Sequence, residues 1–506
     1  MSRHSTPSEL PLHIDKLATA SIPSQLAEQI RTFILNSTLA PGDVLPSTRA
    51  LAERLGISRG SVVAAYEQLT GEGYISAGRG GTQVNENLPP LPSNQQPLAP
   101  SNTAPSPRHD VAPPPPGRVQ PMPLPVRQMI NMQPGTPDTT HLTSAAWRAA
   151  WRIAAAEPGT TYPAMGSPEL QKELAEHLRL MRSVVREPES ILVTTGARDG
   201  LRLVLSALRR EIRHRPLRIA VENPGYPSLH KIPAAFNHSV LSVAVDEHGL
   251  NPANLPTGVD SPDLVLVAPS HQYPLGASMP IARRLELLAW AAENNAYIVE
   301  DDYDSELRYT GNPLPALASL ARSTGEHHDR VITLGSFTKT LTPGLGLGYL
   351  IAPKYLTHVL EQLRAELGSP VSAIVQKAMT EFLRDGGARR HVARMRRVYK
   401  ARRAALLEAF EQGQLPEWVR VLPMDGGLHV VLEFGGAHAT EATERTVVEI
   451  VEESGVLVSA LGDYWAHSGM QQQHRAYGVV IGFGGAKDQW LEQGIRLLVL
   501  ALKRME

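Results

Sequence analysis

The chain has 506 residues, of which 42% are hydrophobic and 20% charged, and its formal net charge is -1. This length predicts at least two folding units, because a single hydrophobic core rarely serves so many residues. Cysteine is absent, the N-terminus lacks the apolar core of a signal peptide, and no apolar run approaches the roughly 18 residues that span a bilayer. We therefore expect a cytoplasmic protein without a membrane partner. A nucleic-acid partner must be argued from motifs, since bulk charge does not indicate one.

The first part of the chain has the pattern of three helices. Apolar residues recur with helical spacing over residues 23–39, where the first helix is predicted. A short helix over 46–55, a turn at Gly56 and a third helix over 59–69, capped by Ser58, follow it. Two short helices around one glycine fit the geometry of a helix-turn-helix.

A glycine-rich hairpin comes after the third helix. Residues 71–75 and 77–84 together predict two strands joined by a glycine-rich tip. The tip carries Arg79, and the hairpin would form a wing. Three polar residues lie where the third helix would meet base edges and phosphates in a major groove: Ser58, Arg59 and Ser61. The plain alternative is a small helical bundle with a hairpin, in which these side chains are only solvated.

The stretches PSQLAEQIRTFIL, LAPGDVLPSTRALAERLGISRGSVVAAYEQL and GEGYI resemble the GntR family of regulators over about residues 10–84. The resemblance implies a winged helix-turn-helix domain of the α+β class, which we place at 10–85, with promoter DNA as its partner. It also implies a set of DNA-contacting residues: Arg49, Ser58, Arg59, Ser61, Arg79 and Gly80. Gly60 departs from the family, in which a polar side chain often stands at this position.

A proline-rich stretch follows. Between Glu86 and Val126 there are 14 prolines in 41 residues, with almost nothing to bury, so we predict a flexible linker over 86–127. Coil statistics give it a typical span of about 35 Å, and an extended polyproline path would reach roughly 125 Å. That reach would allow two subunits of a homodimer to exchange domains.

Beyond this stretch, short apolar runs alternate with helical segments. The runs IAVEN (219–223), LVLVAPS (264–270), AYIVEDDYD (296–304) and VITLGSFTK (331–339) predict the strands of a parallel α/β sheet. Functional residues of such sheets lie at the carboxyl ends of the strands. From about Val371 onward, a long basic helix and then shorter strands predict a second, smaller lobe.

Several of these strand ends carry groups that suit one kind of cofactor. Lys339 follows the strand VITLG and would form a Schiff base with an aldehyde, with Ser336 and Thr338 beside it. Asp301 ends the strand AYIVE and would pair with a protonated ring nitrogen. Residues 195–198 precede a helix whose first amides would hold a phosphate.

Two tyrosines complete this set. Tyr303 would bond a ring hydroxyl, and Tyr226 would stack on the ring face. Taken singly, each residue is more often a surface lysine, a solvated acid or a packing tyrosine. Together, and in this order, they indicate pyridoxal 5'-phosphate (PLP).

The chain over about 128–506 resembles the aminotransferase class of fold type I PLP enzymes, and more closely the MocR subgroup of GntR regulators. The resemblance rests on PSHQYPLGASMPIARRLELLAWA, EDDYDSELRY, GSFTKTLTPGLGLGYL and HVARMRRVYKARR, together with the order of reader, linker and PLP domain. It adds Tyr273, which stands where aminotransferases commonly have a cofactor-contacting asparagine. The implied cofactor site is Lys339, Asp301, Tyr303, Tyr226, Tyr273, Ala197, Arg198, Ser336 and Thr338.

Two positions break the aminotransferase pattern. Gly346 stands where related chains have an arginine for the cofactor phosphate, and our hypothesis is that Arg198 replaces it. Val480 stands where aminotransferases have the arginine that binds the substrate's α-carboxylate. A neutral residue there argues against ordinary transamination, because carboxylate binding orients the amine over the ring.

The leading hypothesis is a dimeric regulator that senses PLP, controls PLP biosynthesis and acts on promoter DNA in the nucleoid, without catalysing a reaction. A regulator of amino-acid or amine metabolism comes second. Two other classes of protein remain as alternatives. One is an active aminotransferase with an accessory DNA-binding domain, and the other is a repressor that does not depend on PLP. No metal-ligand spacing occurs, so we expect no metal site.

Overall fold

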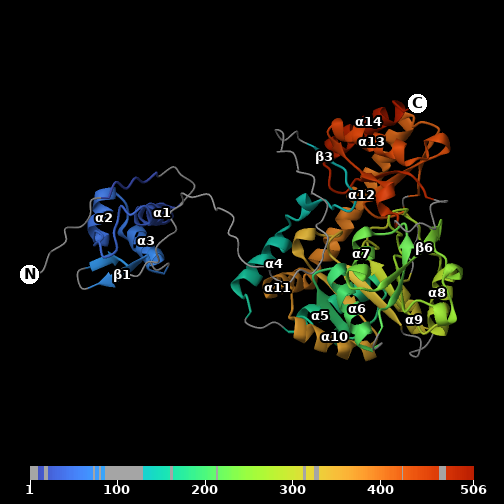
Figure 1. Ribbon diagram of the computed structural model, residues 1–506, viewed down its shortest axis with the longest axis horizontal. Helices are drawn as coiled ribbons and strands as arrows, with labels where there is room; N and C mark the ends of the chain where they lie inside the picture. The colour runs from blue at the N-terminus through green and yellow to red at the C-terminus, as the bar shows by residue number, and fades with distance from the viewer. Residues whose placement is uncertain are drawn as a thin grey trace, which may run out of the picture. The chain divides into compact units, whose positions relative to one another are not determined.

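The computed structural model divides the chain into two compact units, Met1–Val119 and Gln120–Glu506, shown in Figure 1. It describes residues 10–15, 21–71, 74–78, 81–85, 129–159, 163–211, 215–310, 315–323, 330–423, 425–466 and 475–505. The predicted linker lies outside these residues. None of the described helices is long and apolar enough to cross a membrane.

The N-terminal unit consists of three helices and a hairpin. Its helices are α1 (Ile22–Leu35), α2 (Thr48–Leu55) and α3 (Arg59–Gly71), and its strands β1 (Ile75–Gly78) and β2 (Gly81–Val84) pair in antiparallel fashion. Apolar side chains from all of these elements form one core around Leu26, Leu51, Val62, Ile75 and Val84. The predicted order of helix, helix-turn-helix and hairpin is therefore present.

Local capping explains where α2 and α3 begin. The Oγ of Ser47 accepts a hydrogen bond of 3.2 Å from the amide of Ala50, and the Oγ of Ser58 accepts one of 3.1 Å from the amide of Ser61. Gly56 ends α2, as predicted. These caps hold the two helices on either side of one turn.

An eight-stranded sheet forms the centre of the larger unit. Its strands are ordered β4 (Ile191–Thr194), β11 (Gly348–Ile351), β10 (Val331–Ser336), β9 (Tyr297–Asp302), β8 (Leu264–Val267), β5 (Arg218–Asn223), β6 (Ser239–Asp246) and β7 (Gly249–Leu250). Neighbours from β10 to β6 are parallel, whereas β11 is antiparallel to both β10 and β4. The inner strands β5, β8, β9 and β10 are almost entirely buried, which explains their apolar sequences, whereas β6 is largely exposed.

Helices cover both faces of this sheet (Figure 1). One face packs against α4 (Ala145–Ala156), α5 (Pro168–Arg182), α8 (Ile281–Glu293), α9 (Leu317–Ser323) and α11 (Ala373–Arg384). The other face packs against α6 (Ala197–Glu211), α7 (Pro227–Ala235) and α10 (Lys354–Leu367). Alternate residues of the inner strands belong to the two cores. In sheets of this kind, ligands bind at the carboxyl edge.

A smaller lobe contains a second sheet and its own core. The sheet is antiparallel and ordered β12 (Val419–Val421), β13 (His429–Phe434), β16 (Gly478–Gly482) and β15 (Ser459–Ala460). Helices α13 (Glu441–Glu453) and α14 (Asp488–Lys503) cover it, and a separate parallel pair joins β14 (Val456–Leu457) to β3 (Ile130–Asn131).

The boundary of the smaller lobe differs from the predicted start at about Val371. Helix α11 packs in the core of the large sheet, and so does Ala388 at the start of α12 (Gly387–Gly413). Only from Met395 onward does α12 enter the core of the smaller lobe. The helix passes from one core to the other without a break, so the sequence carries no signal at the boundary.

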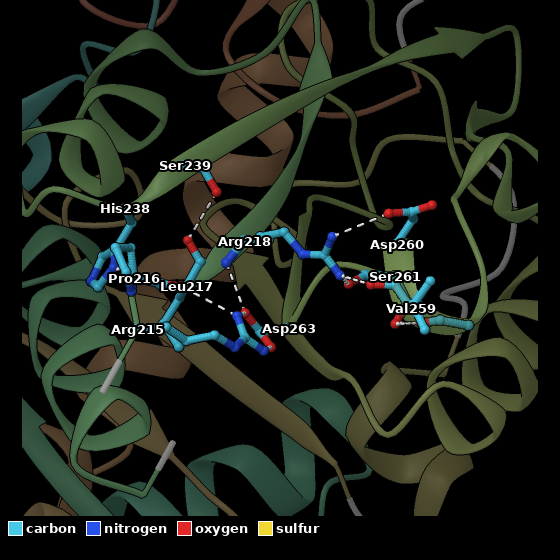
Figure 2. A network of polar contacts seen from close by, with 11 residues as sticks. Arg215, Pro216, Leu217, Arg218, His238, Ser239, Val259, Asp260, Ser261 and Asp263 are labelled. Atoms are coloured by element: carbon cyan, nitrogen blue, oxygen red, sulfur yellow. Dashed lines mark hydrogen bonds and ion pairs between the residues drawn. The ribbon is translucent and has the colours of Figure 1, made fainter. Parts of the chain in front are cut away.

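At the amino-terminal edge of the large sheet, charged groups pair with one another (Figure 2). Arg215 donates two hydrogen bonds, of 2.7 and 2.5 Å, to the carboxylate of Asp263, which also accepts one of 2.8 Å from the amide of Arg218. The guanidinium of Arg218 donates to the carbonyls of Val259 and Ser261 at 2.5 and 2.7 Å. These contacts tie β5 to the segment before β8.

Candidate functional site

A cavity of about 360 Å³ lies at the carboxyl ends of the central strands. Its lining comes from the turns after β4, β5, β8 and β10, from Asp301 near the end of β9 and from Tyr303 directly after this strand. Topology alone brings these turns together, because parallel strands end at one edge. All nine residues predicted for the cofactor line this cavity: Ala197, Arg198, Tyr226, Tyr273, Asp301, Tyr303, Ser336, Thr338 and Lys339.

Lys339 lies in a tight turn after β10. The Oγ of Ser336 contacts the Oγ1 of Thr338 at 2.6 Å. It also accepts a hydrogen bond of 3.1 Å from the backbone amide of Thr338, and the two contacts fix the turn. The Nζ of Lys339 lies 6.0 Å from the centre of the Tyr226 ring and donates a hydrogen bond of 2.7 Å to the carbonyl of Gly135. The contact with Gly135 was not predicted, because the two positions are far apart in the sequence.

Asp301 is an acid without a matching donor. Its side chain is buried, and among the described residues its Oδ1 has no hydrogen-bond partner. Burial, with the nearby charges of Asp302 and Asp304, raises the pKa of Asp301 to about 7, while Lys339 acts in the opposite direction. A buried carboxylate with a free oxygen fits a group that brings its own proton, such as a pyridine nitrogen.

The neighbouring acids have basic partners. Asp302 accepts a hydrogen bond of 2.8 Å from the Nε of Arg182, and both side chains are buried. Asp304 lies 2.8 Å from the Nδ1 of His271. Like Asp301, both acids keep an Oδ1 without a hydrogen-bond partner among the described residues, but in that part of the chain Asp301 differs from them in forming no ion pair.

Tyr303 is held by His271. The hydroxyl of Tyr303 donates a hydrogen bond of 2.9 Å to the carbonyl of His271 and lies 3.1 Å from its Nδ1. Burial, with the nearby Asp304, raises the pKa of Tyr303 well above its usual value, so the hydroxyl stays neutral. Its bond to a ring hydroxyl stays a prediction.

Aromatic side chains form one wall of the cavity. The ring of Tyr273 packs edge to face with the rings of Tyr226 and Tyr464, at centroid distances of 5.2 and 5.3 Å. Val480 belongs to the same apolar cluster and is fully buried in β16, opposite Val431. The position of the expected carboxylate-binding arginine is thus filled by a packed apolar side chain.

Arg198 is the arginine that lines the cavity within the described part of the chain. It lies in the first turn of α6 and is exposed. Burial would raise the pKa of Tyr226, but Lys339, Ser228 and Arg198 outweigh it and lower that pKa, which places Arg198 close to Tyr226. Gly346, where an arginine was expected, ends the short helical turn Pro343–Leu345 with a φ of +53°, a conformation that other residues rarely adopt.

Asp199 holds the turn that carries Arg198. Its Oδ2 accepts hydrogen bonds of 3.1 Å from the amide of Thr195 and 2.7 Å from the Nη2 of Arg364. Both charged side chains are buried. The prediction missed Asp199 and Arg364, because an acid in the first turn of a helix is also an ordinary helix-dipole partner.

The predicted DNA-contacting residues of the N-terminal unit lie at one end of the helix-turn-helix. Arg49, Ser58 and Arg59 are exposed and Ser61 is half-buried. The Nε of Arg59 lies 3.4 Å from the Oγ1 of Thr48, at the start of α2. Ser58 and Ser61 bond to each other at 2.8 Å, so at least part of their role is to cap α3. Two further predicted residues lie outside the described residues: Arg79 and Gly80.

Two protein families match separate parts of the chain. The bacterial regulatory proteins of the gntR family match residues 23–84, and aminotransferase class I and II, a family that binds PLP, matches residues 127–465. Both halves of the predicted fold are confirmed.

Individual relatives match both parts at once. The HTH-type pyridoxine biosynthesis transcriptional regulator PdxR of Corynebacterium glutamicum is 43% identical over 484 residues, which cover 96% of each chain. The regulatory protein MocR of Rhizobium meliloti is 31% identical and covers 98% of this chain and 96% of its own. Among solved structures, the alpha-aminoadipate aminotransferase LysN of Thermus thermophilus is 25% identical, with a TM-score of 0.64, over 75% of this chain and 93% of its own. The chain therefore belongs to the MocR-type regulators of the GntR family, in which a helix-turn-helix unit is joined to an aminotransferase class I and II domain.

Proposed function

We propose that this regulator binds PLP covalently at Lys339, alters its binding to promoter DNA accordingly, and so controls genes of PLP biosynthesis. The observation that carries the proposal is the convergence on one cavity of Lys339, the turn of Arg198, and Asp301, whose Oδ1 has no hydrogen-bond partner among the described residues. The name of the Corynebacterium relative, a pyridoxine biosynthesis regulator, supports this biological setting.

The residues of the cavity fit the parts of PLP. Bound PLP supplies an aldehyde carbon for a lysine amine and a pyridine ring that withdraws electrons. Asp301 would accept the proton of the ring nitrogen and thereby gain the partner that its Oδ1 lacks. Tyr226 would cover one ring face, and Arg198 with the first amides of α6 would hold the phosphate.

The packing around Val480 favours a sensor over an enzyme. Aminotransferases orient their substrates by binding the α-carboxylate, and Val480 offers no charge or donor for this purpose. Its full burial among Tyr273, Val431 and Tyr464 leaves no room for a charged group without rearrangement. We therefore propose PLP itself, rather than an amino acid, as the effector.

Regulation by PLP requires two states that bind DNA differently. We propose that the regulator acts as a homodimer, with its two readers on paired half-sites and its domains exchanged across the subunits. The 41-residue proline-rich stretch is long enough for such an exchange. Light scattering of the full chain in solution tests the dimer, and a monomer at DNA-binding concentrations would contradict it.

The central test measures binding of the full-length protein to DNA from upstream of its own gene, with and without PLP. Pyridoxine, which lacks the aldehyde and the phosphate, is the matched control ligand. We expect PLP, but not pyridoxine, to change the DNA affinity and to give the visible absorption of a lysine-bound aldehyde, which Lys339→Ala should abolish. Equal DNA affinity in all conditions would contradict the sensor, and steady turnover of an amine with a keto acid would favour the enzyme.

A further inference from the structure

Lys339 contacts the first described segment after the proline-rich stretch. Besides the 2.7 Å hydrogen bond from Nζ to the carbonyl of Gly135, the two residues approach closely, and a Cβ atom at position 135 would lie only 2.6 Å from Nζ. Gly135 also has a φ of +83°, which other residues rarely adopt. The backbone conformation therefore favours glycine at this position, and a larger residue would displace the end of the lysine side chain.

This segment, residues 129–138, is anchored at both ends. At its start, β3 pairs with β14 of the smaller lobe, and the carbonyl of Met132 accepts a hydrogen bond of 2.7 Å from the amide of Gly482. At its end, buried Asp138 accepts one of 2.8 Å from Arg402. Between these anchors, the bond from Lys339 is the side-chain hydrogen bond that the described structure gives to residues 134–137.

The segment is also the first described part of the larger unit. It follows the proline-rich stretch directly in the chain, and that stretch leads to the helix-turn-helix unit. A change in how the segment is held therefore acts on the end of the tether. Of the cofactor-site residues, Lys339 is the one for which a bond to this segment is seen.

We propose that the hydrogen bond from Lys339 to the carbonyl of Gly135 depends on the state of the lysine. The bond is present when the lysine amine is free and is lost when the lysine is bonded to PLP. This inference rests on the proposed function, which assigns the cofactor to Lys339. Loss of this hydrogen bond loosens residues 133–137. This loosening is the first step by which the cofactor site acts on the proline-rich stretch that leads to the helix-turn-helix unit.

The chemistry of the lysine supports this step. A free ammonium has three N–H donors, one of which serves Gly135. On condensation with the aldehyde, a C=N bond replaces the aldehyde C=O bond, and two of the three hydrogens leave with the oxygen as water. The remaining hydrogen lies in the plane of the C=N bond and follows the cofactor ring, so the Gly135 carbonyl loses its donor.

Two substitutions of the lysine form a matched pair. Neither Lys339→Met nor Lys339→Arg can form the covalent bond, but arginine keeps N–H donors and a positive charge, whereas methionine keeps the approximate length without a donor. We would follow hydrogen-deuterium exchange of peptides that cover residues 129–138 in full-length protein without PLP. Lys354→Met, at an exposed lysine at the start of α10, is the control.

The expected results separate the two variants. Lys339→Arg and Lys354→Met should exchange like ligand-free wild type, and Lys339→Met should exchange about tenfold faster in this segment, as PLP-loaded wild type does. DNA affinity should follow the same grouping.

Equal exchange in Lys339→Met and Lys339→Arg would overturn the inference. So would unchanged exchange of residues 129–138 in wild type on loading with PLP, a measurement that depends on no variant. Failure of PLP to alter the DNA affinity of wild type would instead overturn the proposed function, so the two failures are distinguishable.

Discussion

The acids at the two edges of the central sheet differ in their burial and in their hydrogen-bond partners. At the amino-terminal edge, Asp263 accepts hydrogen bonds from Arg215 and from the amide of Arg218 (Figure 2). At the carboxyl-terminal edge, Asp301 is more deeply buried than Asp263, yet its Oδ1 has no hydrogen-bond partner among the described residues, and burial raises its pKa to about 7. Proteins rarely leave such a group unsatisfied without a reason. The contrast separates an edge that stabilises the fold from one that is prepared for a ligand.

The largest expected effect is on the stability of the ligand-free protein. The pKa of Asp301 is raised in the folded state, so the folded protein binds more protons than the unfolded chain between about pH 4 and pH 7. Stability is therefore lost as the pH rises through this window. We expect Asp301→Asn to stabilise the ligand-free protein by about 2 to 4 kcal/mol at pH 8 and by much less at pH 4.

Thermal unfolding of both proteins across this pH range measures the difference. Asp260→Asn, at an exposed acid of the amino-terminal edge, should change stability little at any pH. A destabilised Asp301→Asn protein at pH 8 would mean that Asp301 has a structural partner after all.

The same substitution should weaken PLP binding. Asparagine cannot supply the charge that pairs with a protonated ring nitrogen, so we expect about a 30-fold loss of affinity. Titration of the visible absorption at fixed pH measures it. The Asp301→Asn substitution should then raise the stability of the ligand-free protein and lower its affinity for PLP. An unchanged PLP affinity would mean that Asp301 does not contact the cofactor.

Asp263→Ala should show the reverse behaviour. It removes the acceptor of Arg215 and of the Arg218 amide, and we expect a loss of about 1 to 2 kcal/mol of stability. The effect is modest because Arg215 is 48% exposed, so water screens its charge. PLP affinity should stay at the wild-type value, and a clear loss of affinity would mean that the two edges are coupled.

The smallest expected effect belongs to Arg198→Ala. If Arg198 holds the cofactor phosphate in place of an arginine at position 346, its removal should weaken PLP binding about tenfold. Arg202→Ala, on the exposed side of the same helix, is the matched control. Equal affinities of the two variants would assign the phosphate to the backbone amides of α6 alone.

Much of the candidate site could be predicted because its residues follow strands. Tyr226, Asp301 and Lys339 each come directly after or at the end of an apolar run, and parallel strands bring such positions to one edge. Asp199 and Tyr464 could not be predicted in the same way. Their roles depend on contacts with Arg364 and Tyr273, which lie far away in the chain.

Local sequence was sufficient for the helix-turn-helix and for the strands of the large sheet. Caps such as Ser47 and Ser58, apolar periodicity and the Gly56 turn act within a few residues, so their signals are visible in the chain. Long-range packing decided the rest. The passage of α12 between two cores, the open oxygen of Asp301 and the bond from Lys339 to Gly135 arise only when distant segments meet.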